Sequence, residues 1–233
     1  IINGLHPQEF QMPVVLAVGF FDGVHRGHQA VLKDAVKLAK EVKADPAVLT
    51  FYPHPMTVLA PDIPVPLLLS QEEKEKIIED MGFHYMIVVR PSVDFLRKTA
   101  DHFLADLGGM YHLKGIVTGE NFTFGKGAAG NGFLLKKYFK NTSVQVHLIS
   151  LKEEDGRIIS STGIRETILA GHMKKAARLL GRNYVIRGDI IHGFKRGMQL
   201  TGFPTANLRP ERGRIIPKDG VYATRARIRG HSY

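Results

Sequence analysis

Short apolar runs alternate with longer amphipathic segments between residues 14 and 149 of the chain. The apolar runs are typical of buried parallel strands, and they cover residues 14–18, 47–51, 84–89, 114–118 and 144–149. The segments between them have helical periodicity, which predicts helices over residues 26–42, 71–82, 93–107 and 133–139. Because parallel neighbours need crossover connections, which helices supply, the alternation predicts an α/β fold with a doubly wound, five-stranded parallel sheet.

The pattern changes after Leu151. Residues 160–169 and 173–180 predict two more helices, the second ending at Gly181. From Tyr184 onward the sequence is strand-like and interrupted by glycines, which predicts a small antiparallel barrel or sheet. We therefore expect two domains, residues 1–182 and 183–233.

Local signals mark the ends of several elements. Pro53 and Pro55 forbid further ladder pairing after the second strand, so a loop is expected there. Ser70 has the character of an N-cap, and Glu73 takes the capping-box position three residues later.

The end of the first strand has the strongest chemical signal. The strand breaks at Gly19 into a loop that carries His25 and His28, three residues apart in the first turn of the next helix. Helix N–H groups and the helix dipole favour an anion there, so the two imidazoles could stabilise charge on a nucleoside triphosphate. Gly19 and Gly23 allow the close backbone approach that a phosphate needs. On spacing alone, the pair could instead be a helix cap or a remnant of a metal site.

The composition narrows the choice of partners. The chain has 233 residues, 44% of them hydrophobic, and it has no cysteine, which excludes disulfides, thiolate zinc sites and cysteine nucleophiles. No apolar run approaches 18 residues, so we expect a cytoplasmic protein without a membrane partner.

The formal charge of +10 attracts polyanions, but the basic residues are scattered and not interleaved with aromatic residues. We therefore expect small nucleotides as partners rather than nucleic acid. The oligomeric state is left open.

Five motifs in order carry a resemblance over nearly the whole chain: GFFDGVHRGH, TFYPHP, TGENFTFGKGAAGN, ISSTGIRETILAG and LTGFPTANL. With them, the chain resembles the prokaryotic bifunctional riboflavin kinase and FAD synthetase family. The segment GKGAAGNG lacks the Lys-Ser or Lys-Thr ending of a P-loop, which argues against that alternative.

The resemblance implies a Rossmann-like FMN adenylyltransferase domain of the nucleotidyltransferase superfamily, followed by a riboflavin kinase domain of β-barrel type. The FMN phosphate would attack the α-phosphorus of ATP in line, pyrophosphate would leave, and FAD would form, with Mg²⁺ carried in by ATP. Riboflavin would be the substrate of the kinase.

The resemblance also assigns residues to the transferase reaction. The positions that match the catalytic residues of the family are His25, His28, Asn121 and Arg165. The positions that match its ATP-binding segments are Gly19, Phe20, Asp22, Gly23, Ser160, Ser161 and Thr162. For residues 160–162, simple N-capping of a helix is the alternative role.

Flavin binding is expected at two places. Pro53, His54 and Pro55 would contact the isoalloxazine ring, and Phe122 and Phe124 would contact it or stack on it. Phenylalanines near a strand end can equally belong to the core.

For the kinase, the resemblance implies that Thr205 and Asn207 of PTAN bind the magnesium ion and phosphates of ATP. Gly193 and Lys195 would line the same phosphates.

The kinase of the family also uses a glutamate base further along the chain than this sequence reaches. Glu211 and Asp219 are the acidic residues after PTAN, and neither matches that position. We expect that the sequence omits a C-terminal part, since a folded domain seldom ends within a sheet. The alternative is a short protein without kinase activity. In both cases, adenylyl transfer is expected, whereas kinase activity of this chain is not.

Two other functions stay open. The first is another nucleotidyltransferase with the same histidine motif, although the PTAN segment has no reason to accompany it. The second is a basic nucleotide-binding or RNA-binding protein without turnover, which would not need His25, His28, Asn121 and Arg165 together.

Overall fold

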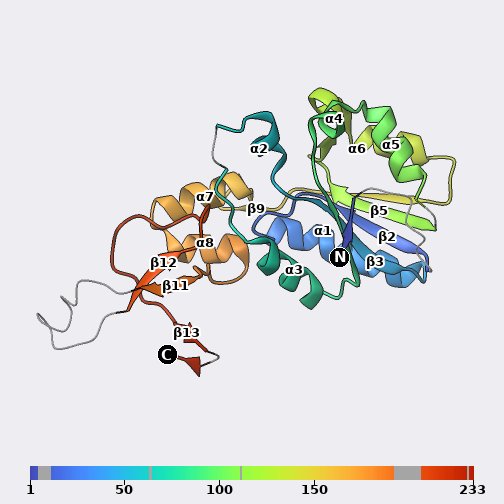
Figure 1. Cartoon of the computed structure of the whole chain (residues 1–233). Coiled ribbons are helices and arrows are strands. Elements are labelled where there is room, and N and C mark those ends of the chain that lie inside the picture. The colour runs from blue at the N-terminus through green and yellow to red at the C-terminus, as the bar shows by residue number, and fades with distance from the viewer. Residues whose placement is uncertain (5–11, 63–64, 111, 192–205, 230) are drawn as a thin grey trace, which may run out of the picture.

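The computed structural model describes residues 1–4, 12–62, 65–110, 112–191, 206–229 and 231–233. At its centre lies a parallel sheet of six strands in the order β1-β4-β3-β2-β5-β8 (Figure 1). The strands are β1 (Ile2–Asn3), β2 (Val14–Val18), β3 (Asp45–Phe51), β4 (Tyr85–Val89), β5 (Leu113–Gly119) and β8 (Gln145–Ile149). The predicted parallel sheet is confirmed, and β1 adds an edge strand that is too short for a hydrophobic pattern to indicate.

Helices cover both faces of this sheet (Figure 1). Helices α1 (Arg26–Glu41) and α3 (Gln71–Asp80) pack on one face, and α5 (Ala100–Gly108) and α6 (Gly132–Phe139) pack on the other. Successive residues of a strand point to opposite faces, so Val15 of β2 packs with α1 while Leu16 packs with α5. All five residues of β2 are buried, which explains why its sequence is apolar without interruption.

Several element boundaries differ from those predicted. The helix expected over residues 93–107 is two helices, α4 (Val93–Arg97) and α5, because the Thr99 side chain caps a new helix by accepting from the His102 N–H. The short helix α2 (Pro55–Leu59) interrupts the expected loop. The capping box of Ser70 and Glu73 is confirmed.

The helices that follow the sheet agree closely with the sequence. They are α7 (Ser161–Leu169) and α8 (Met173–Leu180), which ends at Gly181 in the left-handed conformation. Short elements fill the connections around β8: β6 (Thr123–Phe124), the 3₁₀ helix η1 (Lys126–Ala128), β7 (Gly130–Asn131), β9 (Glu153–Glu154) and β10 (Arg157–Ile158). Of the helices in the described segments, none combines the length and apolar character needed to span a bilayer.

Strand β2 lies at the topological switch point of the sheet. The chain runs from β2 to β3 and β4 on one side, then crosses to β5 and β8 on the other. In open α/β sheets, ligands bind at the carboxyl ends of the strands at such a point. The loop from Gly19 to His25 follows β2 there.

The C-terminal part forms two small antiparallel pairs. Strand β11 (Gly188–Ile191) pairs with β12 (Asn207–Pro210), and β13 (Arg227–Ile228) pairs with β14 (His231–Ser232). An antiparallel sheet is therefore present, but no closed barrel is found among the described residues. Closure requires every strand to pair on both sides, and here each pairs on one side.

A segment after β12 returns to the α/β unit through Arg214. Its guanidinium binds the carboxylate of Glu73 at 2.6 and 3.3 Å and donates to the carbonyl oxygen of Leu68 at 3.2 Å. The side chains of Arg214 and Glu73 are 3% and 5% exposed, so this ion pair is buried. Arg187 adds a more exposed contact to the same carboxylate at 3.1 Å. Residues of the C-terminal part therefore contact the α/β unit at the start of α3.

We predict that Arg214→Met lowers the free energy of unfolding by about 3 kcal/mol, because it leaves the buried carboxylate of Glu73 without its main partner. Arg209→Met is the control, since its pair with Asp189 is exposed and such pairs contribute roughly 0–1 kcal/mol. Urea unfolding of both variants measures the difference. Equal decreases in the free energy of unfolding would show that the buried ion pair stabilises the protein no more than the exposed one.

Candidate active site

The loop after β2 is folded tightly against the core. Phe21, Gly23 and Val24 all have positive φ angles, of 56°, 82° and 37°. A Cβ atom at Gly19 would lie 2.9 Å from the ring of Phe21, and one at Gly23 would lie 2.7 Å from a methyl group of Leu68. These contacts leave no room for larger side chains, so both glycines are needed for this loop path.

His25 and His28 form a stacked pair at the start of α1. The ring centroids are 3.6 Å apart and the planes differ by 17°. His25 is the N-cap, and its Nδ1 accepts from the N–H of His28 at 3.3 Å. The Nδ1 atom of His28 is buried and finds no hydrogen-bond partner within the described part of the chain. A buried polar atom without a protein partner at a helix N-terminus is suited to hydrogen-bond a bound anion.

Burial keeps both imidazoles neutral at physiological pH. It lowers the pKa of His25 to about 4, with a smaller contribution from the nearby cation of Arg182. Burial also holds the pKa of His28 well below its usual value, and the neighbouring His25 and the cation of Lys74 act in the same direction. A neutral imidazole carries one N–H donor, so the pair offers donors to an anion without carrying charge itself.

Asp22 ties this loop to two other segments. Its carboxylate is 3% exposed and accepts from the backbone N–H groups of Leu68 at 3.0 Å and Leu69 at 3.3 Å. It also accepts from the guanidinium of Arg165. Burial raises the pKa of Asp22, and the charge of Arg165 opposes this rise. The carboxylate is thus used within the protein, where it fixes the loop.

Helix α7 meets the same loop through its first residues. Ser161 donates its hydroxyl to the carbonyl oxygen of Asp22 at 2.9 Å, and Arg165 donates its Nε to the carbonyl oxygen of Pro66 at 2.9 Å. Ser160 is the N-cap and accepts from a backbone N–H, as its alternative role required, while Thr162 is exposed. The structure thus brings Asp22, Ser161 and Arg165 together, although 143 residues separate the two charged side chains.

Two polar residues that the sequence analysis missed hold the carbonyl groups of the loop. Arg182 donates to the carbonyl oxygens of Gly23 at 2.7 Å and Val24 at 3.2 Å. Gln29 donates to the carbonyl oxygen of Val24 and to that of Leu180. Neither belongs to a quoted motif, so only the fold reveals them.

Lys74 of α3 is the third residue that the sequence analysis missed. Its side chain is buried, with Nζ 3.3 Å from Oγ1 of Thr50 and 3.5 Å from the carbonyl oxygen of Phe20. The ammonium also lies 5.0 Å from the centre of the Phe20 ring. Burial lowers the pKa of Lys74 to about 8. One sequence signal exists, since Lys74 precedes the buried Ile78 by four residues and so shares its helix face.

The predicted flavin segment at residues 53–55 reaches the same loop. The ring of His54 contacts the ring of Phe20 edge-on, with centroids 4.3 Å apart. His54 also caps α2, which begins at Pro55, and the Tyr52–Pro53 peptide bond is cis. The segment is therefore next to the histidine loop, and flavin binding by it stays a prediction.

The candidates after β5 are placed differently. Phe124 is buried in the core beside Phe103, with ring centroids 5.0 Å apart, and Phe122 is partly buried and stacks on it at 5.7 Å. This placement fits the alternative role in the core. Asn121 is exposed just beyond β5, the strand that neighbours β2. A part for these residues in binding stays a prediction.

Most of the residues predicted for the kinase site are not described by the structure. Gly193, Lys195 and Thr205 lie outside the described residues, and Asn207 is exposed in β12 opposite Ile191. The described segments contain no group of three or more histidine or acidic side chains that could hold a metal ion.

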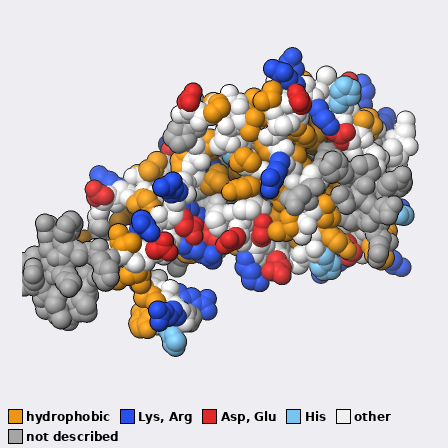
Figure 2. Space-filling view, in the orientation of Figure 1, with side chains coloured by type: hydrophobic (Ala, Val, Ile, Leu, Met, Phe, Trp, Pro, Cys, Tyr) orange, Lys and Arg blue, Asp and Glu red, His pale blue; other side chains and the backbone are white. Residues whose placement is uncertain are grey.

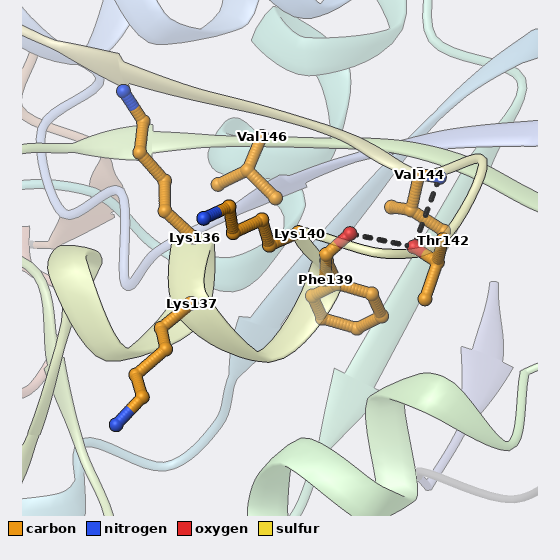
Figure 3. A pocket seen from close by; sticks show the side chains of 7 residues that line it. All are labelled: Lys136, Lys137, Phe139, Lys140, Thr142, Val144 and Val146. Atoms are coloured by element: carbon orange, nitrogen blue, oxygen red, sulfur yellow. Dashed lines mark hydrogen bonds between the residues drawn. The ribbon is translucent and has the colours of Figure 1, made fainter.

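A hollow of about 420 Å³ lies on α6 and β8 (Figure 3), and none of the predicted site residues lines it. Figure 3 shows the amines of its lysines pointing in different directions, not converging on one point. The residues that line it are Lys136, Lys137, Phe139, Lys140, Thr142, Val144 and Val146. It is therefore not the candidate site.

Comparison with known proteins identifies the family. The FAD synthetase family model matches residues 7–163, and the riboflavin kinase family model matches residues 180–233. Curated proteins named bifunctional riboflavin kinase/FMN adenylyltransferase are 38% identical in Listeria monocytogenes, 36% in Bacillus subtilis and 34% in Escherichia coli K12. The matches cover 94%, 100% and 96% of this chain, which spans 69%, 74% and 72% of those relatives.

A crystal structure titled as a macrolide-efflux protein from Streptococcus pneumoniae is 32% identical, with a TM-score of 0.90 over 100% of this chain and 77% of that one. Its fold is therefore shared over the whole chain, whereas its title describes that protein alone. The matched family models, the curated relatives and the stacked histidines at the switch point agree. The chain belongs to the bifunctional riboflavin kinase and FMN adenylyltransferase family.

Proposed function

We propose that the site transfers the adenylyl group of ATP to FMN and forms FAD. A phosphate oxygen of FMN bonds to the α-phosphorus of ATP, the bond from that phosphorus to the bridging oxygen breaks, and pyrophosphate leaves with the electron pair. The observation that carries this proposal is the neutral, stacked pair of His25 and His28 at the N-terminus of α1. Relatives named as FMN adenylyltransferases support the choice of substrates.

The reaction needs positioning and charge stabilisation more than proton transfer. The attacking phosphate oxygen of FMN already carries negative charge near pH 7, so no general base is required. Charge develops on the departing pyrophosphate, where neutral N–H donors and the first N–H groups of α1 can stabilise it. His28 suits this role because its Nδ1 atom has no hydrogen-bond partner among the described residues.

Arg165 and Asp22 act by holding this arrangement in place. Their ion pair fixes the loop against α7, so that the histidines meet the phosphates without rearranging. Asn121 is proposed to approach the reacting groups from the end of β5. Mg²⁺ arriving with ATP would neutralise phosphate charge, which suits a site whose described residues supply no carboxylate cluster.

We also propose the division of the chain at residues 182 and 183. The first part carries adenylyl transfer, and the second belongs to a barrel-type riboflavin kinase domain in which Thr205 and Asn207 hold magnesium and ATP. The ranges of the two family models and the antiparallel pairing of β11 with β12 support this division. The contact of Arg214 with Glu73 joins the two parts.

We predict that His28→Ala lowers the rate of FAD formation from FMN and ATP by roughly 10²-fold, a typical loss for one preorganised transition-state contact. Chromatographic analysis of flavin products measures it. His84→Ala is the control, because His84 is an exposed residue next to the amino end of β4. An unchanged rate in His28→Ala would remove this residue from the mechanism.

We predict that Thr205→Ala leaves the rate of FAD formation from added FMN within about twofold of the wild type, a change at the level of ordinary surface substitutions. Its proposed ligand is the ATP of the kinase reaction, and added FMN bypasses that reaction. The assay compares FMN with riboflavin as substrate. Loss of FAD formation from FMN would overturn the proposed division.

A further inference from the structure

The buried ammonium of Lys74 lacks an anionic partner. No carboxylate oxygen of the described residues lies within ion-pair distance of its Nζ, which contacts a hydroxyl, a backbone carbonyl and the face of an aromatic ring, none of them an anion. Asp22 and Glu75 act on it at longer range. Asp22 is already occupied by Arg165. Burial of a charge is costly unless a counter-charge is close, so this position calls for an explanation.

Arg214 provides the contrast within the same helix region. It is also buried, but it is paired with Glu73, the neighbour of Lys74 in the sequence. Of the two buried cations in the described residues, Arg214 therefore has a carboxylate partner, whereas Lys74 has none. The missing partner of Lys74 is therefore best sought outside the chain.

The surroundings of Lys74 indicate where that partner lies. Phe20 and Thr50, which hold its ammonium, come from the ends of β2 and β3. Burial is the main cause of the lowered pKa values of His28 in α1 and of His54, the N-cap of α2, and the charge of Lys74 contributes to both. The Phe20 ring beside the ammonium also contacts the ring of His54, so the cation lies next to the loop at the switch point and near the predicted flavin segment.

We propose that Lys74 is the buried counter-charge for a phosphate group bound at this site. The inference rests on the proposed function and adds to it a residue outside the recognised motifs. The phosphate belongs either to ATP or to FMN, since both are anions that the reaction brings to the loop. The positive charge strengthens binding through the low-dielectric interior, and it needs no direct contact.

The test compares Lys74→Met with Lys76→Met in the full chain. Methionine keeps most of the buried stem but removes the charge. Lys76 is on the same helix, but it is exposed and paired with Glu79 and Asp80, so its loss serves as the matched control. Calorimetric titration with magnesium-ATP alone, and separately with FMN alone, identifies which phosphate is held.

We expect Lys74→Met to weaken binding of one of these ligands by about tenfold or more, and Lys76→Met to leave both unchanged. Urea unfolding of the ligand-free protein should show Lys74→Met at least as stable as the wild type, because an unpaired buried charge has been removed. A lysine with a merely structural role would give the opposite pattern, a loss of stability with unchanged binding.

The pH dependence separates charge from shape. The pKa of Lys74 is about 8, so the wild type should lose affinity for the same ligand as pH rises through 8, and Lys74→Met should not. The other titratable or charged groups that face it are Asp22, His28, His54 and Glu75. The pKa values of both histidines are lowered, so neither changes charge in this range.

The possible outcomes are distinct. If the wild type forms FAD but Lys74→Met binds both ligands as tightly as the wild type, the inference is overturned and the proposed function stands. A decline above pH 8 that persists in Lys74→Met also overturns it. If the wild type forms no FAD from FMN and ATP, the proposed function itself fails.

Discussion

The buried carboxylate of Asp22 is the interaction on which the candidate site depends. It joins the loop after β2, the backbone at residues 68 and 69, and Arg165 of α7. These three segments are far apart in the sequence. The loop after β2 has three residues with positive φ angles, and contacts with the other two segments hold this strained backbone in place. The surface charges, by contrast, are dispersed: on the face shown in Figure 2, the side chains of Lys and Arg are interspersed with those of Asp and Glu and form no single patch.

The hydrogen bonds that hold the loop after β2 extend to the C-terminal part of the chain. Leu68 gives its N–H to Asp22 and its carbonyl oxygen to Arg214, which lies in the region matched by the riboflavin kinase family model. One short backbone segment therefore connects the histidine loop to the second part of the protein. The site that results offers neutral donors and a buried cation, which suits a reaction between two anions whose main requirement is positioning.

Local sequence patterns predicted much of the fold. The uninterrupted apolar run at residues 14–18, the capping box at Ser70 and the glycine end of α8 each depend on a few adjacent residues, and all are confirmed. The split between α4 and α5 was missed because Thr99 interrupts an otherwise helical pattern. The described residues form no closed barrel, and strand-like sequence alone does not reveal which strands pair. The contacts of Asp22 with Arg165 and of Lys74 with Thr50 could not be predicted, because they join segments that only the tertiary fold brings together.

The most direct test of adenylyl transfer is to follow a labelled phosphate from ATP. The chain is incubated with FMN, magnesium and ATP labelled at either the α or the γ position, and the products are separated. The account predicts that the α label enters FAD and the γ label leaves in pyrophosphate, in equal amounts. A γ label in the flavin product, or release of the γ label as inorganic phosphate without FAD, would contradict it.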